Sequence, residues 1–576
     1  MTGQIAARLQ LAMAGALGGA LLWAASEASQ RNWIADYPML ILIGGLLTLF
    51  AALLGMAGPI GLARALPRAA GLAAVVAALL ALTMLRYATP GDFLRGVVPA
   101  LAALTVALLP VPFLIAAARS GWRDYPALFL EAWSVLLRLA AAGAFTGLVW
   151  LVIYLSDEVL RIVGIHVIGT LLRSELAMML VTGAVLGLGM AVIHELADLL
   201  SPYVVLRLFR LFLPVVLAVM VVFLLALPFR GLSGLTGALS PALLLLTLVG
   251  GGIALVSIAV DQSDAEAAAN PVLRRSAQAM ALILPVLAGL ALWAIRLRVA
   301  DRGWTPDRVF VALVAGIGVG YGLVYAQAVL RGGAWMERIR QGNIRMALAV
   351  IALAALWLTP ILNAERISAQ SQLARFLDGR TPVEALDIQA IGGWGKPGAE
   401  AMARLEAMAA EPGQELLARR LSGEAIGPGA DERGALQAAV AAAMPVQPAS
   451  ATGTRDMLLD AAEDYMLRDW KQVCGEGLGS GRAGCLMVVA DLLPALPGEE
   501  AMLFLQRGAD YVEITGIYLG PDGRVVQRIT ARPDGGFFSG AEAADLMRSY
   551  QDAPPPLTPA LVNQLGTGET GLMIQP

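Results

Sequence analysis

The stretch Leu211–Phe229, LFLPVVLAVMVVFLLALPF, carries no charged side chain. A helix needs about 20 apolar residues to cross the hydrocarbon core of a bilayer, and this stretch is long enough, or nearly so. Leu101–Ala118 has the same character. Stretches of this kind recur through residues 1–362 and then cease. The sequence therefore predicts an all-α polytopic membrane helix bundle over residues 1–362.

The apolar stretches predict about eleven spans. They are Leu9–Ser26, Tyr37–Ala57, Pro67–Leu85, Gly96–Ala118, Leu139–Leu155, Leu176–Leu196, Val205–Phe229, Pro241–Val260, Ala277–Ile295, Arg308–Leu330 and Ile344–Leu362. An amphipathic stretch, Trp122–Arg138, precedes the fifth span. Arg161, His166 and Arg173 interrupt the segment Glu158–Glu175, which is therefore predicted as an interfacial loop. If this segment were a span, the orientation of every later span in the membrane would be reversed.

The composition excludes some classes of partner. Of the 576 residues, 58% are hydrophobic and 15% are charged, and the net charge is −3. Soluble proteins carry about 25% charged residues, and the deficit here is concentrated before Thr359. No basic block of the kind that binds nucleic acid is present in the sequence. The predicted partner is the lipid bilayer, and no motif calls for a cofactor or a metal.

Arginines in short loops indicate which ends of the spans face the cytoplasm. With the N-terminus inside, the inside loops hold Arg64, Arg68, Arg119, Arg123, Arg207, Arg210, Arg274, Arg275, Arg331, Arg338, Arg340 and Arg345. One outside loop disagrees, because Arg296, Arg298, Arg302 and Arg308 crowd the connection between spans nine and ten. Eleven spans and a cytoplasmic N-terminus predict a C-terminal domain on the outer side of the membrane, which is the periplasm if the host is Gram-negative.

The first apolar stretch has a second interpretation. Arg8 precedes the run Leu9–Ala25, and small residues follow it, which is the outline of a cleaved signal peptide. Many more spans follow, so a retained first helix is the simpler interpretation.

Small residues and prolines mark where spans are expected to pack and to bend. Glycine at four-residue spacing lets helices approach closely in lipid, and Gly183, Gly187 and Gly189 lie along the sixth span. Proline removes a helical hydrogen bond and bends the helix. Leu213-Pro214-Val215 and Leu284-Pro285-Val286 resemble each other, and matched broken helices are typical of transporter binding sites, but this similarity is short.

Ionisable groups in membrane helices are functional candidates, because their burial is costly. His194, Glu195 and Asp198 cluster at the end of the sixth span. The cluster resembles the zinc-protease pattern His-Glu-x-x-His, but it lacks the second histidine, and two ligands do not make a good zinc site. Solvation at the interface is the simpler interpretation, and a proton relay through His194 and Glu195 is the functional alternative.

Residues 363–576 have soluble patterning and predict an α+β extramembrane domain with a small antiparallel sheet. Its predicted helices are Glu365–Arg380, Pro397–Ala410, Glu415–Arg420, Asp431–Met444, Thr454–Trp470 and Ala541–Tyr550. Its predicted strands are Cys485–Ala490, Ala501–Leu505, Tyr511–Tyr518 and Arg524–Ile529, with a turn at Pro521-Asp522-Gly523 between the last two. Pro445–Gly453 is predicted as a linker.

Cys474 and Cys485 are the only two cysteines of the chain. In an oxidising compartment such a close pair is a candidate disulfide, worth about 3 kcal/mol or less, and in the cytosol the pair would be two thiols. The loop between them contains Gly479-Ser480-Gly481-Arg482-Ala483-Gly484. This matches the dinucleotide pattern G-x-G-x-x-G, but that site needs a strand before the loop and a helix after it. Here the order is reversed, so cofactor binding is not predicted.

Two sets of residues carry a family resemblance. The first set is Trp357–Asn363, which includes Pro360 and Asn363, then Ile367–Gln372, which includes Ser368, Ser371 and Gln372, and then Arg375, Gly379 and Asp387. The second set is Gly303–Arg308, which includes Trp304, Thr305, Pro306 and Arg308, together with Arg207–Pro214. These stretches resemble the bacterial inner-membrane family named domain of unknown function 4153, from about the fifth span through the start of the soluble domain. The resemblance implies a multi-span fold and carries no established activity, so it implies no catalytic residue.

The sequence favours a non-enzymatic envelope protein, a scaffold or sensor that presents a periplasmic domain to an unidentified envelope partner. The rival hypothesis is a secondary transporter or channel for a small solute, supported by the number of spans and by their prolines. A membrane-embedded enzyme is a third hypothesis, which depends on His194, Glu195 and Asp198 alone.

Overall fold

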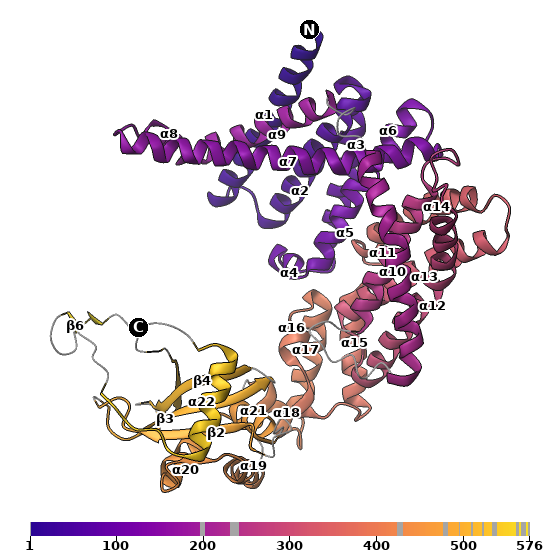
Figure 1. Cartoon of the computed structure of the whole chain (residues 1–576). Coiled ribbons are helices and arrows are strands. Elements are labelled where there is room, and N and C mark those ends of the chain that lie inside the picture. Colours follow the sequence, from indigo (N-terminus) through magenta and orange to yellow (C-terminus); the bar gives the residue numbers. More distant parts are fainter. Residues whose placement is uncertain are drawn as a thin grey trace. The chain divides into compact units, whose positions relative to one another are not determined.

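A computed structural model describes residues 2–195, 202–230, 241–422, 430–475, 482–494, 496–508, 511–520, 523–530, 532, 538–559, 564–565 and 572–573. The chain divides into two compact units, Met1–Leu421 and Ser422–Pro576. The first is helical and the second contains the sheet (Figure 1). Each unit is described by itself below.

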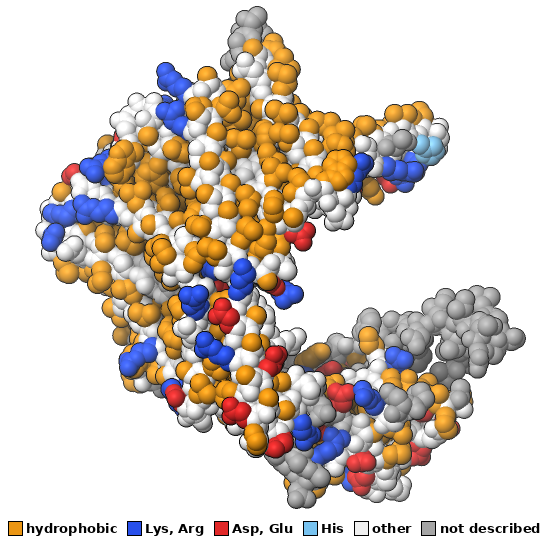
Figure 2. All heavy atoms as spheres, turned by 180° about the vertical axis from the view of Figure 1, so that it is seen from behind, with side chains coloured by type: hydrophobic (Ala, Val, Ile, Leu, Met, Phe, Trp, Pro, Cys, Tyr) orange, Lys and Arg blue, Asp and Glu red, His pale blue; other side chains and the backbone are white. Residues whose placement is uncertain are grey.

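Within the described residues, the first unit contains 11 helical segments that are long and apolar enough to cross a membrane, as predicted. They are α1 (Thr2–Gln30), α2 (Asp36–Ile60), α3 (Leu62–Thr83), α5 with α6 (Val97–Leu108 and Val111–Arg119), α7 (Tyr125–Ile162), α9 (Glu175–Glu195), α10 (Pro202–Arg230), α11 (Pro241–Val260), α12 (Pro271–Arg302), α13 (Pro306–Leu330) and α14 (Trp335–Trp357). Apolar side chains cover much of their visible surface (Figure 2).

Two spans differ in shape from the prediction. The fourth is interrupted between α5 and α6, where Pro110 stands at the N-cap position of α6 and supplies no backbone N–H. The fifth is part of a single helix of 38 residues, α7, because no helix breaker separates the amphipathic stretch from the apolar one. At 1.5 Å per residue α7 is about 57 Å long, longer than a bilayer core of about 30 Å.

The segment predicted as an interfacial loop contains no spanning helix. After α7 the chain turns at Gly164, forms the short helix α8 (Val167–Leu172) and then enters α9. A second short helix, α4 (Pro90–Arg95), follows α3 and begins with a capping box between Thr89 and Asp92.

The first and sixth spans, α1 and α9, cross at Gly183 and Gly187, which were predicted to pack, and at Gly15 of α1, which was not. A Cβ atom added at Gly15 would lie 2.0 Å from the carbonyl oxygen of Gly183, and one added at Gly187 would lie 2.1 Å from that of Leu11. The two backbones therefore touch with no side chain between them, which is the contact that small residues at four-residue spacing allow.

Contacts between helix ends fall into two groups. In one group, Arg86 after the third span contacts Glu365 after the eleventh, and Trp304 after the ninth contacts Ser371. In the other, the end of α9 approaches Gly58 of α2, and the end of α11 contacts the beginnings of α10 and α14. If eleven spans cross the membrane in alternating directions, the helix ends within each group all lie on the same side of the membrane.

Four helices and a 3-10 turn follow the last span within the first unit. They are α15 (Ala364–Leu377), η1 (Val383–Ala385), α16 (Ile388–Gly392), α17 (Gly395–Ala409) and α18 (Glu415–Leu421). Leu373, Leu386, Leu405 and Leu417 are buried in their shared core. The predicted division after residue 362 marks the end of the spans, whereas the compact units divide after Leu421, because α15 packs on α13 and carries the next helices with it.

The second unit has helices on both faces of one mixed sheet with strand order β1-β2-β3-β4-β5. The strands are β1 (Val446–Gln447), β2 (Cys485–Ala490), β3 (Glu500–Gly508), β4 (Tyr511–Leu519) and β5 (Val525–Ile529). The predicted linker contributes β1, which pairs parallel with β2, and the remaining pairs are antiparallel. A separate short pair joins β6 (Gln564–Leu565) to β7 (Leu572–Met573).

Alternating residues of β2 and β3 face opposite layers of the second unit, as the pleat of a strand requires. Met487 and Leu503 pack with α19 (Ala430–Ala443), α20 (Thr452–Ala461) and α21 (Asp464–Gly475). Leu486 and Phe504 pack with α22 (Gly540–Asp552) on the other face. A single helix to Trp470 was predicted where α20 and α21 stand, and the break at Ala462, which has extended backbone angles, corrects it. Of the predicted turn at 521–523, Pro521 and Asp522 lie outside the described residues.

Candidate functional site

The family-like motif residues, which are far apart in sequence, meet where the turn between α12 and α13 contacts α15. The backbone N–H of Trp304 donates to Ser371 Oγ at 3.1 Å. Gln372 Nε2 donates to the carbonyl oxygens of Arg302 at 3.0 Å and Trp304 at 2.9 Å. Two residues of α15 thus bind both sides of the turn.

Two arginines complete the capping of α12. The last four carbonyl groups of a helix have no partner within it. Arg375 donates from Nη1 to Ala300 O at 3.0 Å and from Nη2 to Asp301 O. Arg308 Nη1 donates to Arg302 O at 3.2 Å and to Gly303 O at 2.6 Å. Positive charge at a helix C-terminus is also favoured by the helix dipole. The two arginines therefore stabilise the end of α12 both by hydrogen bonds and by their charge.

Gly303 makes this close packing possible. Its φ of +73° lies in the region that residues with a Cβ rarely adopt. A Cβ atom there would lie 2.6 Å from Arg375 Cδ and 2.8 Å from Gln372 Nε2. The glycine therefore supplies both the turn and the room for α15. We name this set of contacts, made by Gly303, Arg308, Ser371, Gln372 and Arg375, the α15 clasp.

Most of the remaining family-like residues lie at the starts of α13 and α15. Thr305 Oγ1 accepts from the N–H of Arg308 at 3.3 Å, and Pro306 occupies the first turn of α13. Asn363 Oδ1 accepts from the N–H of Arg366 at 3.0 Å and caps α15. Ser368 is buried within α15, and Pro360 lies in the turn between α14 and α15.

A second attachment joins α15 to the connection after α3. The guanidinium of Arg86 donates to a carboxylate oxygen of Glu365 and to the carbonyl oxygen of Trp357. The Tyr87 hydroxyl donates to the other carboxylate oxygen of Glu365. Burial, together with the Glu365 carboxylate, raises the pKa of Tyr87 well above its ordinary value. The phenol therefore stays protonated and remains a donor.

The same connection also receives α17. The backbone N–H of Lys396 donates to Arg86 O at 2.9 Å, and its Nζ donates to Met84 O at 2.7 Å. Gly395, with a φ of +59°, lies so close that an added Cβ would be 2.7 Å from Arg86 O. Lys396 and Gly395 therefore hold the first turn of α17 against the carbonyl groups of residues 84–86.

Two cavities lie beside these attachments. One of 380 Å³ is lined by Arg308, Gln372 and Arg375 of the α15 clasp, by the end of α12 and by residues between Arg380 and Trp394. The other, of 570 Å³, is lined by Tyr87, Glu365 and residues of α4, α5 and α13. Ala390 and Trp394 line both. Cavities of this volume are large enough for small ligands.

A buried ionic cluster lies among the helix ends of the other group, and the sequence analysis did not predict it. Asp261, immediately after α11, is fully buried and pairs with Arg210 of α10. Arg340 of α14 donates to Asp261 O at 3.0 Å and to Asp264 at 2.7 Å. Burial raises the pKa of Asp261. The two arginines had been counted only as loop charges, because sequence spacing gives no sign of a partner on another helix.

A hydrogen-bonded polar cluster joins four spans near this ionic cluster. Tyr325 of α13 contacts Ser257 of α11 at 2.8 Å and donates to Asn343 of α14. Asn343 Nδ2 donates to the Tyr125 hydroxyl of α7 at 2.9 Å and to Ser257 Oγ at 3.2 Å. We name these four residues the Tyr325 cluster. Single tyrosines and serines are too common in apolar helices for sequence to have indicated it.

The polar cluster at the end of the sixth span is described only at His194. Its Nδ1 lies 3.4 Å from Nη1 of Arg138, and Arg138 in turn donates to Glu131 at 3.1 Å. The side chain of Glu195 and the whole of Asp198 lie outside the described residues. No group of three or more His, Cys, Asp or Glu that could hold a metal occurs in the described part of the chain.

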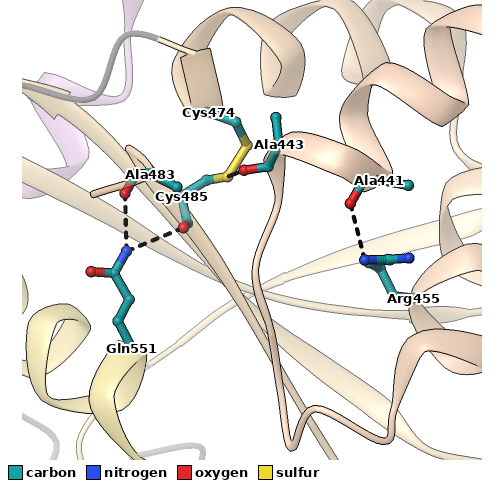
Figure 3. Close-up of a disulfide and its surroundings, with 7 residues drawn as sticks. All are labelled: Ala441, Ala443, Arg455, Cys474, Ala483, Cys485 and Gln551. Atoms are coloured by element: carbon teal, nitrogen blue, oxygen red, sulfur yellow. Dashed lines mark hydrogen bonds between the residues drawn. A yellow bond between two sulfur atoms is a disulfide. The ribbon is translucent and has the colours of Figure 1, made fainter. Parts of the chain in front are cut away.

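In the second unit, Cys474 of α21 and Cys485 of β2 form a disulfide (Figure 3). Both cysteines are buried in the core between the helices and the sheet. Gln551 of α22 donates to Ala483 O at 2.9 Å and to Cys485 O at 3.4 Å. The start of β2 is therefore fixed from both faces of the sheet. Of the pattern Gly479–Gly484, residues 479–481 lie outside the described residues.

No family model, no curated protein and no solved structure was found to match the chain.

Proposed function

We propose that this chain is a non-enzymatic integral protein of a bacterial inner membrane, a scaffold or sensor that presents its second unit to the periplasm. We also propose membership of the family named domain of unknown function 4153. The α15 clasp supports the family proposal, because residues chosen for their resemblance contact one another directly.

One observation carries the scaffold or sensor role: the helix that leaves the last span is held to the bundle at two separate places. The α15 clasp holds it to the ninth and tenth spans, and the Glu365 pair holds it to the connection after the third. A buried ion pair has strict geometric demands. A shift of these spans would therefore move α15, and with it the chain that continues toward the second unit.

The sidedness has three supports. An odd number of spans separates the N-terminus from residue 364, the inside loops are richer in arginine under this orientation, and a disulfide in the second unit suits an oxidising compartment. Reporter fusions test it. Alkaline phosphatase joined after Pro576 is expected to be active and a cytosolic fluorescent protein there dark, with the reverse for fusions after Gly121. A fluorescent C-terminal fusion would reject the proposed sidedness.

The presenting role makes a separate prediction in intact cells. A photo-cross-linking residue at Ile529, which is 91% exposed in the second unit, is expected to form one reproducible adduct with an envelope protein. The matched control is Leu225, an exposed residue in a span, which is expected to give none with that protein. Failure of several exposed positions of the second unit to form any adduct would count against a scaffold.

A secondary transporter or channel is the second candidate, and the Tyr325 cluster favours it. Polar side chains within spans are costly and often mark solute or proton pathways, and this cluster joins four helices. Solute flux into proteoliposomes, compared between the natural protein and Asn343→Leu, tests this function. Flux no faster than in empty liposomes across ions, sugars and amino acids would exclude it for those solutes.

A further inference from the structure

The 380 Å³ cavity beside the α15 clasp has an excess of positive charge. Its charged lining residues are Arg302, Arg308, Arg375, Arg380, Asp301 and Asp387. Four guanidinium groups and two carboxylates leave a net of two positive charges. Asp387 is also engaged at the start of α16, where Oδ1 accepts from the N–H of Ala390 at 2.9 Å.

The two arginines nearest the helix ends have no carboxylate partner among the described residues. Arg375 is 9% exposed, its Nη atoms bond only to backbone carbonyls, and its Nε has no partner in the described part of the chain. Arg308 is half-buried, and within the same residues its guanidinium donates only through Nη1. Positive charge withdrawn from water without a counter-ion is costly, so the cavity as built favours an anion.

The two outer arginines can turn toward such an anion at little cost. Arg302 pairs with its neighbour Asp301, and Arg380 pairs with Asp378. The side chains of both pairs are more than half exposed. Exposed ion pairs contribute little stability, so both guanidinium groups are available to a ligand.

The location of the cavity indicates which class of anion it would bind. It lies at the C-terminal end of α12, where the candidate span Pro271–Arg302 ends and where Arg296 and Arg298 are exposed. Lipid phosphate groups occupy this depth of a bilayer, and the planar guanidinium matches phosphate oxygens in pairs. Trp394 and Ile391 add an apolar wall.

We propose that this cavity is a binding site for a phosphate group, in which Arg302 and Arg380 close on the phosphate against Arg308 and Arg375. The phosphate belongs either to a lipid headgroup or to a soluble phosphate compound. The site also accounts for two of the four arginines, Arg302 and Arg308, that crowd this outside loop. The inference goes beyond the proposed function, because a scaffold and a transporter could each carry such a site.

The test uses the full chain in nanodiscs. In phosphatidylcholine discs with a minor fraction of phosphatidylglycerol, native mass spectrometry measures which lipid stays bound. In discs of phosphatidylcholine alone, calorimetry measures the binding of inorganic phosphate. The double variant R302Q/R380Q removes the two exposed arginines and leaves the α15 clasp intact. Because it loses at least one charge-assisted hydrogen bond, it is expected to bind the phosphate group about tenfold more weakly.

The matched control is R296Q/R298Q, which removes the same number of charges, both from α12, but changes no residue that lines the cavity. If the natural protein and R296Q/R298Q retain phosphatidylglycerol and R302Q/R380Q does not, the site exists and its phosphate belongs to a lipid. Phosphate binding with the same pattern supports a soluble source. Equal losses in both double variants, or no binding of either probe by the natural protein, would overturn the proposal.

Discussion

Arg86 and Glu365 are 279 residues apart in sequence, yet they form an ion pair whose side chains are 1% and 8% exposed. Arg86 follows the third span and Glu365 begins the helix after the eleventh. The pair thus fixes the distance between the ends of the third and eleventh spans. Its partners Tyr87 and Trp357 satisfy further hydrogen bonds of the same two groups.

Removal of one partner from this pair is expected to be severe. Arg86→Gln leaves the Glu365 carboxylate buried without a counter-ion, which costs about 3–5 kcal/mol. Thermal unfolding of the purified protein in detergent is expected to show a large fall in Tm. The control is Arg95→Gln, because Arg95 is exposed and pairs with Asp92 only at the surface, where a pair is worth about 0–1 kcal/mol. Equal Tm values for the two variants would contradict the assigned role of Arg86.

The tyrosine of this site gives the protein a pH dependence of known sign. The pKa of Tyr87 is raised in the folded chain above its ordinary value of 10.0. Its protonated form therefore adds stability below about pH 10, and that stability is lost as the pH rises toward the higher folded pKa. In a series of Tm measurements from neutral to alkaline pH, the difference between the natural protein and Tyr87→Phe is expected to shrink above pH 10. A difference that stays constant would refute this.

The crossing of α1 and α9 tolerates no added side chain. Gly183→Val places atoms where the backbone of α1 stands, since even a Cβ would lie 2.1 Å from Gly15 O. The backbones must separate, at a cost of about 1–3 kcal/mol for overpacking, and we expect a lower Tm and a lower yield of folded protein. Gly147→Val in α7 is the control, because an added Cβ meets nothing within 4 Å there. The prediction fails if both variants unfold alike.

The Tyr325 cluster is expected to contribute to stability whatever the protein transports. Asn343→Leu removes the group that bonds to Tyr125, Ser257 and Tyr325. Each buried hydroxyl left unsatisfied costs about 1–3 kcal/mol, so the midpoint of denaturation should fall markedly. Gln341→Leu serves as the comparison, because Gln341 bonds only to the nearby Glu337 at an exposed site and is expected to change little. A harmless Asn343→Leu would mean that the cluster is not formed.

The cysteine pair can be tested by counting thiols. Since the chain has only two cysteines, a maleimide reagent added to denatured protein from the membrane is expected to label neither before reduction and both after it. Cys474→Ser is then expected to free Cys485 for labelling and to destabilise the second unit by about 3 kcal/mol or less. Labelling of both cysteines without a reductant would show that the bond does not form in the cell.

The spans were predictable because hydropathy depends on local sequence alone. The runs of apolar residues lead to the same eleven segments as the helices, and β2 matches its predicted range, Cys485–Ala490. The prediction was wrong where the end of a helix depends on tertiary packing. A single apolar face from Leu459 to Trp470 is compatible with one helix, and only the core against the sheet shows that two helices are needed to bury it.

The candidate site was predictable in part. The residues of the α15 clasp were singled out by resemblance, although nothing in their spacing says that Arg375 caps α12. Arg86, Asp261 and the Tyr325 cluster were missed, because the partner of each lies on another helix far away in sequence. An isolated charge beside a span looks the same whether it faces water or a buried counter-ion.

The contact between α1 and α9 has a consequence for biogenesis. Within this chain α1 is synthesised before α9, the sixth span, which its glycine surface fits, so four further spans enter the membrane before its partner exists. During that interval the surface around Gly15 and Gly19 must face lipid or an insertion factor. A chain truncated before residue 175 therefore exposes an unmatched helix to membrane quality-control proteases, whereas a chain whose residues 175–195 have entered the membrane buries that surface.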